Sequence, residues 1–349
     1  MKQERDSRFE LLRIVSMIFI ICGHYAYHGF SNDFDVYSRS MKSSILFTSI
    51  GGQVGVNIFV MISGYFGIDN KINIKDKIKN LANQVWFYSY FIYVILLLLG
   101  IYDFSLHNAY IAFLPIISKE YWFATAWIVL VLLMNIINSY FRKLSKISYK
   151  RILIICMIIW VIIPTFLYGN MYENELIWFS VLYILGGYLK KFEISISKTK
   201  CLIYGVFCWL ICWMSGIIIS YIGETITIFN GKEFYFYGGN KLPIVATSIF
   251  IFMFISKCTP FYNNKINDIG KTMFAVYLVH DNYFIRNVLW QYLNKIFSIN
   301  NSIKFMEIGL IVILFVLSIG FVTEKLRKVI CVLLRKEFYK YEFIKKCKN

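Results

Sequence analysis

Apolar residues occur along this chain in long runs that are separated by short polar segments. Most runs are about 20 residues long, the length that an α-helix needs to cross the hydrocarbon core of a bilayer. The pattern predicts ten membrane-spanning helices, in chain order at roughly 9–29, 43–66, 81–101, 122–140, 151–169, 175–190, 201–222, 242–257, 270–290 and 305–325. The sixth and eighth runs are shorter than the others. We therefore expect an all-α protein, a polytopic transmembrane helical bundle.

The composition excludes an ordinary soluble domain. Hydrophobic residues make up 58% of the 349 residues and charged residues only 16%, whereas about a quarter of the residues of soluble proteins are charged. The mean hydropathy is +0.59. We therefore expect a multi-pass protein of the cell (plasma) membrane.

The positive charge of the chain follows the predicted topology. The formal net charge is +17, which in a soluble protein would suggest a nucleic-acid partner. With ten spans, however, 29 of the 37 lysine and arginine residues lie on the side of the membrane that holds both termini. Loops rich in Lys and Arg are cytoplasmic. The sequence therefore predicts cytoplasmic termini, contacts with membrane lipids and no nucleic-acid partner.

Two regions are predicted, a transmembrane domain over 1–330 and a basic cytoplasmic tail over 331–349 that suits the anionic inner leaflet. No other segment outside the spans is large enough for a domain. The longest external loops are about 102–121 and 223–241. The second of these loops is rich in Gly and aromatic residues. It is either a substrate-facing loop or an interfacial aromatic belt.

The N-terminus resembles a signal peptide only superficially, because no small-residue cleavage site follows the first apolar run, which we interpret as an uncleaved span. The eight cysteines form no Cys-x-x-Cys pair, and none falls in a predicted external loop. No disulfide is therefore predicted.

Two ionisable residues share one face of the first span. Arg13 and His24 are eleven positions apart, which turns a helix through about 1100°, roughly 20° past three full turns. The helical rise separates them by about 16 Å, so that Arg13 is predicted near the cytoplasmic surface and His24 beyond the midplane. Ionisable groups inside a bilayer are costly and indicate function. An Arg at the interface and a hydrogen-bonded His inside the bundle are the structural alternative.

Two neighbours extend this pair. Glu10 precedes Arg13 by three positions, so that its carboxylate can hold the guanidinium. His28 follows His24 by four positions, which could suggest a metal pair. Because no third ligand of matching spacing is near in the sequence, no metal site is predicted.

Polar residues also occur in the second, fourth and ninth spans. Gln53 and Asn57 place two amides on one face of the second span, either as contacts between helices or as the lining of a polar cavity. In the same span Gly51 and Gly55 permit close helix approach.

Two further residues are candidates for binding. His280 is a second intramembrane histidine, in the ninth span. Trp122 begins the fourth span, where it either marks the membrane interface or stacks on a sugar ring. The chain has no Gly-x-Ser-x-Gly elbow, Walker loop or His-Glu-x-x-His motif.

Four sequence elements, taken together, resemble a known family. They are the Arg-x10-His pair of Arg13 and His24 after Glu10-Leu11-Leu12, the Gly-x-x-Gly-Val-x-x-Phe-x-x-x-Ser-Gly-Tyr pattern from Gly52 to Tyr65, which includes Ser63, the segment Tyr121-Trp122-Phe123, and the Tyr-Leu-x-His segment at 277–280. In this order, over nearly the whole chain, they resemble membrane acyltransferase family 3.

This resemblance implies a ten-helix enzyme that moves an acyl group, usually acetyl, from cytoplasmic acetyl-CoA to extracytoplasmic glycans. The donor is a substrate, and no permanently bound cofactor is expected. His24 matches the family's essential histidine and Arg13 its partner arginine. Many members have an Arg-x-x-Arg motif where this chain has Lys75-Asp76-Lys77-Ile78-Lys79. We expect Lys75 and Lys79 to meet the CoA phosphates as point charges, without the bidentate fork of Arg.

The mechanism that follows places CoA near Arg13 and uses His24 either as a general base on a sugar hydroxyl or as an acyl acceptor. The predicted acceptor-binding residues are Gln53, Asn57, Ser63, Trp122 and His280. Capsule, exopolysaccharide, teichoic acid, exported oligosaccharide and lipid-linked sugar all fit as acceptors, and a homo-oligomer is possible. The rival functions are a transporter, which would favour repeat symmetry and broken helices, and a membrane sensor, which usually carries an output domain.

Overall fold

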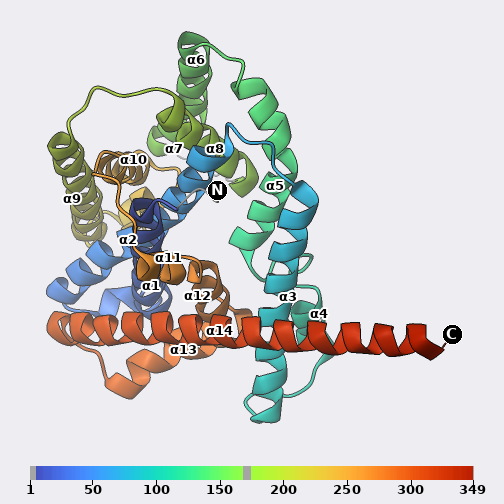
Figure 1. Ribbon diagram of the computed structural model, residues 1–349. Helices are drawn as coiled ribbons and strands as arrows, with labels where there is room; N and C mark the ends of the chain where they lie inside the picture. Colours follow the sequence, from blue (N-terminus) through green and yellow to red (C-terminus); the bar gives the residue numbers. More distant parts are fainter. Residues whose placement is uncertain (1–4, 168–173, 349) are drawn as a thin grey trace.

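The computed structural model of the protein describes residues 5–167 and 174–348 and, over these residues, contains helices and no strands (Figure 1). The α-helices are, in chain order, α1 Ser7–Phe30, α2 Arg39–Gly67, α3 Ile74–Leu98, α4 Leu106–Phe113, α5 Trp122–Phe141, α6 Lys146–Met157, α7 Ile163–Phe166, α8 Glu175–Lys191, α9 Lys198–Gly223, α10 Leu242–Ser256, α11 Asn264–Gly270, α12 Met273–His280, α13 Tyr283–Phe297 and α14 Ser302–Lys348. Short 3₁₀ segments lie at Phe34–Val36, Thr227–Phe229 and Tyr235–Tyr237, and a π-helical turn at Ile158–Ile162 joins α6 to α7. The predicted all-α architecture is confirmed.

Over the described residues, eight helical segments are long and apolar enough to cross a membrane. They are Ser7–Phe30, Arg39–Gly67, Ile74–Leu98, Trp122–Phe141, Lys146–Phe166, Lys198–Gly223, Tyr235–Ser256 and Ser302–Leu333. The polytopic helical class is therefore confirmed, while the count of ten and the side of the termini stay predictions. The other two predicted spans do not form single long helices. The sixth corresponds to α8, which has only 17 residues, and the ninth, 270–290, is divided among α11, α12 and α13.

Several predicted boundaries differ from the structure. α3 begins at Ile74 instead of residue 81, because the Asn73 side chain caps the helix by accepting from the Asp76 N–H at 3.3 Å. Lys75 and Lys79 therefore lie on a helix instead of in a loop. The predicted boundary at residue 330 falls inside α14, which continues to Lys348. The predicted end of the fifth span, at 168–169, lies outside the described residues.

Glycines let α1 and α2 pack closely at the centre of the bundle. A Cβ at Gly51 would lie 2.8 Å from the Phe19 carbonyl oxygen, and one at Gly55 would lie 2.8 Å from Ile20 Cγ1. Real Cβ atoms do not approach so closely, so the two backbones can meet only where side chains are absent. The close approach predicted from the glycine spacing is present, and it fixes the depth of α1 against α2.

The long helix α14 closes one side of the bundle. In Figure 1 it lies across α3 and continues beyond α3 toward the C-terminus. Tyr88 and Gln84 of α3 donate hydrogen bonds to Glu324 Oε2 of α14 at 3.0 and 3.2 Å. A Cβ at Gly320 would lie 2.6 Å from Val276, so α12 also packs tightly on α14. α12 is thus held between α14 and the rest of the bundle.

The helical run 270–290 is interrupted at Asp281 and Asn282. Asn282 Oδ1 accepts the Phe284 N–H at 3.0 Å and caps α13. Its Nδ2 donates to Glu120 Oε1 at 2.7 Å and to the Tyr121 hydroxyl at 2.8 Å. The segment before α5 therefore holds the end of α12, and with it Asp281, in a fixed position.

The seven cysteines whose side chains are described are free thiols. Several of them lie on α9, a helix whose side chains are largely exposed on the outside of the protein. No disulfide joins the described elements.

Candidate active site

Three of the four histidines of the chain meet at one point. His24 and His28 lie one turn apart on α1, with ring centroids separated by 5.1 Å. His280, at the end of α12, places its ring centroid 5.2 Å from that of His24. The fourth, His107, lies on the exposed helix α4. Tertiary packing therefore gathers the chain's titratable imidazoles around His24.

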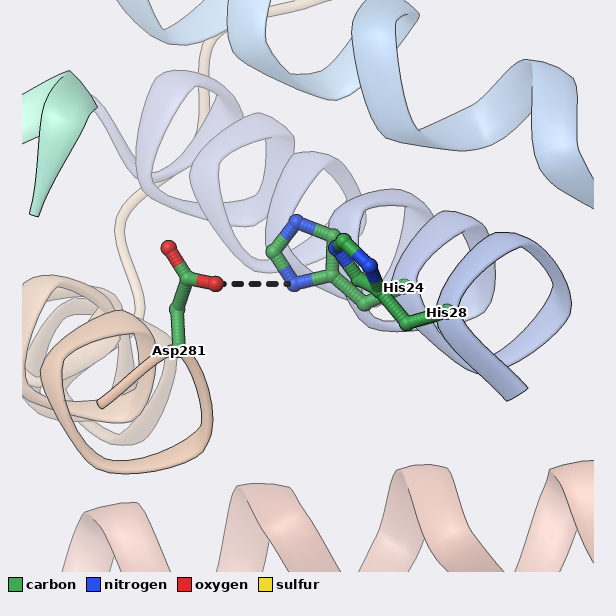
Figure 2. Close-up of side chains that lie close together, drawn as sticks. All are labelled: His24, His28 and Asp281. Carbon is green, nitrogen blue, oxygen red and sulfur yellow. Dashed lines mark ion pairs between the residues drawn. The ribbon is translucent and has the colours of Figure 1, made fainter. Parts of the chain in front are cut away.

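Asp281 faces His24 from the end of α12. The His24 Nδ1 atom lies 3.9 Å from Asp281 Oδ1, and the side chains are 15% and 1% exposed. Figure 2 shows this contact at Nδ1, which leaves the second ring nitrogen, Nε2, outside it. A carboxylate behind Nδ1 orients a histidine whose Nε2 then exchanges protons.

Arg286 of α13 balances the buried carboxylate of Asp281. Its Nη1 lies 3.3 Å from Asp281 Oδ1. A buried carboxylate without such a partner would be strongly destabilising. The pair therefore lets a charged group stand behind His24 in a largely apolar interior.

His280 has one free nitrogen. Its Nδ1 lies 2.6 Å from the Val276 carbonyl oxygen, which can only accept, so Nδ1 carries the proton. Its buried Nε2 has no hydrogen-bond partner among the described residues. This nitrogen is therefore an acceptor within the cluster.

A polar cavity opens on one side of His24. This histidine cavity has a volume of about 380 Å³ and is lined by His24, His28, Gln53, Trp122 and neighbouring residues. Phe234, Tyr237 and Gly238 of the predicted 223–241 loop also line it. The loop therefore faces the cavity, as a substrate-facing loop would. An adjoining cavity of about 290 Å³ shares Gln53 and Trp122 and reaches Trp178 of α8.

An apolar slot begins on another side of His24. It has a volume of only about 30 Å³, close to that of one water molecule. His24, Val56 and Trp122 line both this slot and the histidine cavity. The slot extends to Met17, one helical turn from Arg13. His24 therefore stands between a polar cavity and a small apolar slot that ends at Met17.

A third hollow, the arginine cavity, lies around Arg13 and has a volume of about 500 Å³. Glu10 accepts hydrogen bonds from Arg13 and, at 3.2 Å, from Arg5. Lys190 of α8 also lines the cavity and lies 4.9 Å above the Tyr65 ring. Three cationic side chains therefore face this space.

The other predicted binding residues occupy different surroundings. Asn57 donates to the Gly239 carbonyl at 2.7 Å and accepts from Trp178 Nε1 at 3.1 Å, so both ends of its amide join helices and loop. Ser63 donates at 3.4 Å to the Phe59 carbonyl of its own helix. Neither residue lines the cavities described above.

The lysines of α3 lie apart from the arginine cavity. Lys75 and Lys79 are exposed and do not line it. Lys77 points inward instead, with Nζ 3.6 Å from Met134 Sδ and 5.7 Å from the centre of the Trp127 ring. The helical rotation of α3 therefore separates three lysines that the sequence places together.

Two site residues had no assigned role in the sequence. Asp281 follows His280 directly, and this adjacency was the only local signal for it. Lys190 counted only toward the positive charge of its loop. Neither position relative to α1 can be read from spacing in the sequence, because α8 and α12 are far from α1 in the chain.

A family model described as an acyltransferase domain matches residues 6–323. This match covers essentially all of the predicted transmembrane domain and includes Arg13, His24 and Asp281. No curated protein and no solved structure matches the chain.

Proposed function

The chain belongs to acyltransferase family 3 and is a membrane acyltransferase, and from this premise we propose that it carries acetyl from cytoplasmic acetyl-CoA to a hydroxyl of an extracytoplasmic or lipid-linked glycan. One observation carries the proposal. His24, with Asp281 behind it, stands where the polar histidine cavity meets an apolar slot that ends at Met17, one helical turn from Arg13.

The orientation in this proposal rests on the distribution of charge. The Lys- and Arg-rich loops and the Arg13 end of α1 share one side of the predicted topology, which the positive-inside rule makes cytoplasmic. The histidine cavity then opens toward the exterior. Donor and acceptor accordingly approach His24 from opposite faces of the membrane.

The donor binds at the arginine cavity in this scheme. Arg5, Arg13 and Lys190 line that cavity and supply the positive charge that CoA phosphates need. Lys75 and Lys79, on the exposed first turns of α3, attract the anionic donor from solution. The thioester arm then reaches His24 along the slot, which has a volume of only about 30 Å³ and must therefore widen when the donor binds.

The acceptor binds in the histidine cavity. Trp122, Phe234 and Tyr237 offer aromatic faces for a sugar ring, and Gln53 offers an amide for its hydroxyls. In this scheme the same amide donates to the oxygen of the reacting carbonyl. His280 and Asn57 support these groups without lining the cavity. His280 packs beside His24, and Asn57 holds the 223–241 loop through its hydrogen bond to the Gly239 carbonyl.

In the reaction, His24 Nε2 removes the proton of the sugar hydroxyl while that oxygen attacks the thioester carbonyl. The tetrahedral intermediate then expels the CoA sulfur, which receives the proton from His24 as free thiol. The products are an O-acetyl sugar and CoA, with no net proton change. Asp281 stabilises the transient imidazolium, while Arg286 keeps Asp281 ionised.

A His24→Ala variant tests the proposal. We expect it to insert at the normal level and to lose acetyl transfer, measured with labelled acetyl-CoA in proteoliposomes and by the O-acetyl NMR signals of surface glycans. His107→Ala, which removes the exposed histidine of α4, is the matched control and should keep full activity. Normal O-acetylation with His24→Ala would contradict the role of His24. Altered solute uptake with an unchanged glycan spectrum would favour a transporter.

The acyl-histidine route makes a different prediction in the same preparation. Incubation with acetyl-CoA alone would then leave acetyl on His24, detectable by mass spectrometry of the intact protein. A general base leaves the protein unmodified until the acceptor is present.

A further inference from the structure

His24, His28 and Asp281 form a group with the chemistry of a transition-metal site. One ligand atom from each of these residues lies within 4.8 Å of those of the other two. The sequence offers His24 and His28 at helical spacing but no third ligand near them. The interruption after α12 supplies the third, because it places Asp281 beside α1 (Figure 2).

Buried atoms of the group are free to bind. Two of its ligand side chains have buried atoms, His24 Nδ1 and Asp281 Oδ2, with no hydrogen-bond partner among the described residues. A neutral imidazole nitrogen in this state is costly to bury without a partner, and metal coordination is one way to satisfy it. Two imidazoles and a carboxylate suit Zn²⁺ and its neighbours in the transition series, while Mg²⁺ and Ca²⁺ prefer oxygen ligands.

An ion can reach the group through the histidine cavity. His24 and His28 both line this cavity of about 380 Å³, and His28 is only half-buried. The third residue, Asp281, is buried behind them. An ion entering from this cavity therefore meets the two imidazoles first and the carboxylate last.

The geometry sets a limit on affinity. Tetrahedral ligands at the usual Zn distance of 2.0–2.2 Å lie about 3.4 Å apart, so the most widely spaced atoms of the group, which are up to 4.8 Å apart, must close by more than about 1 Å. Arg286 also lies 3.3 Å from Asp281 Oδ1 and repels a cation. Both effects weaken binding, and we expect micromolar dissociation constants instead of the tighter values of structural zinc sites.

We infer that His24, His28 and Asp281 bind a divalent transition-metal ion of the zinc type that enters from the histidine cavity and inhibits the enzyme. Metal binding itself is independent of the proposed function. The inhibition rests on it, because a metal ligated by His24 withdraws the imidazole from proton transfer.

Metal binding is tested with Co²⁺ on the purified full-length protein, followed by its visible absorption. We expect one Co²⁺ per chain in the wild type, displaced by Zn²⁺. His28→Gln and Asp281→Asn should weaken binding at least ten-fold, and His107→Gln, the matched histidine control, should not. Equal affinities for His28→Gln and His107→Gln would overturn the site, as would a thiolate-to-cobalt charge-transfer band, which would place the ion on a cysteine.

Inhibition is tested on acetyl transfer in proteoliposomes. We expect micromolar Zn²⁺ to inhibit the wild type and His107→Gln, and a chelator to restore the activity. His28→Gln should need at least ten-fold more Zn²⁺ to lose the same fraction of whatever activity it keeps. Co²⁺ binding at the histidines without inhibition would contradict the inhibitory role. A wild type that binds no Co²⁺, together with an inactive His24→Ala variant, would overturn the metal site and leave the proposed function standing.

Discussion

His24 Nδ1 lies 3.9 Å from Asp281 Oδ1, although the two residues are far apart in the sequence. Asp281 reaches this position because α12 stops at His280 and Asn282 starts a new helix. Because the helix is interrupted here, the Asp281 carboxylate points at α1. In a continuous helix, the backbone at residue 281 would instead follow the axis of α12. The separation is longer than a hydrogen bond, as is common before substrates bind.

We expect Asp281→Asn to reduce the turnover number while changing KM for acetyl-CoA little. An amide cannot stabilise the His24 imidazolium, and the comparable change in a Ser-His-Asp triad costs about 10⁴ in kcat. A loss of roughly 10²-fold or more is expected, measured by steady-state transfer in proteoliposomes. Asp268→Asn, which removes an exposed carboxylate of α11 paired with Lys271, is the control. Full turnover with Asp281→Asn would rule out the proposed stabilisation of the His24 imidazolium by Asp281.

The donor site can be located by comparing two lysines. Both side chains are exposed, but Lys190 lines the arginine cavity and Lys75, on α3, does not. Hydrogen bonds to charged groups contribute about 1.5–3 kcal/mol, so Lys190→Ala should raise KM for acetyl-CoA roughly ten-fold or more. Lys75→Ala should raise it less than about three-fold at physiological salt, because Lys75 does not line the cavity and its charge acts on the donor only through screening solvent. The reverse order would place the donor at α3.

The stability of the protein should depend on pH through Glu120. Burial raises the pKa of Glu120 to about 7 in the folded protein, although Ser89 and Asn282 donate hydrogen bonds to its carboxylate. An exposed Glu has a pKa of about 4.3. Between these two pKa values, the Glu120 carboxyl is protonated in the folded protein and ionised in the unfolded chain. The stabilisation is complete below about pH 4.3 and is lost as the pH rises through 7.

Glu120→Gln should remove this dependence, because the amide does not titrate. The check is the melting temperature of detergent-solubilised protein between pH 4.5 and pH 8, which should vary less in the variant. Glu307→Gln, an exposed Glu on α14, is the control and should follow the wild type. Parallel profiles for Glu120→Gln and wild type would contradict the raised pKa.

The packing of α1 on α2 predicts unequal effects of two Gly→Ala substitutions. A Cβ at Gly51 would lie 2.8 Å from the Phe19 carbonyl oxygen, while one at Gly205 of α9 meets its nearest neighbour, Phe250, at an ordinary 3.5 Å. Gly51→Ala should cost about 1–3 kcal/mol from overpacking, seen as a lower melting temperature and lower activity. Gly205→Ala should be neutral or slightly stabilising, since Ala favours the helix. Equal melting temperatures would show that α1 can move away from α2.

Much of the fold follows from local sequence patterns. Apolar runs of membrane-spanning length predicted the helical class, and most helix ends lie within a few residues of the predictions. The early start of α3 depends on the Asn73 cap, which a hydropathy pattern does not register. The interruption at Asp281 was missed for a similar reason, because both flanking segments are apolar and only the hydrogen bonds of Asn282 decide where α12 ends.

The sequence by itself determined that this is a helical membrane protein and that Arg13 and His24 share one helix face. These two features depend on the composition of each run and on the fixed rotation per residue, which are local properties. Four sequence motifs carried the resemblance to the acyltransferase family. Only the tertiary structure decided that Asp281 lies behind His24 and that Lys190, not Lys75, lines the arginine cavity. Such contacts join segments that are distant in the chain. They depend on where helices end and on how closely glycines let helices pack, and spacing along the chain predicts neither.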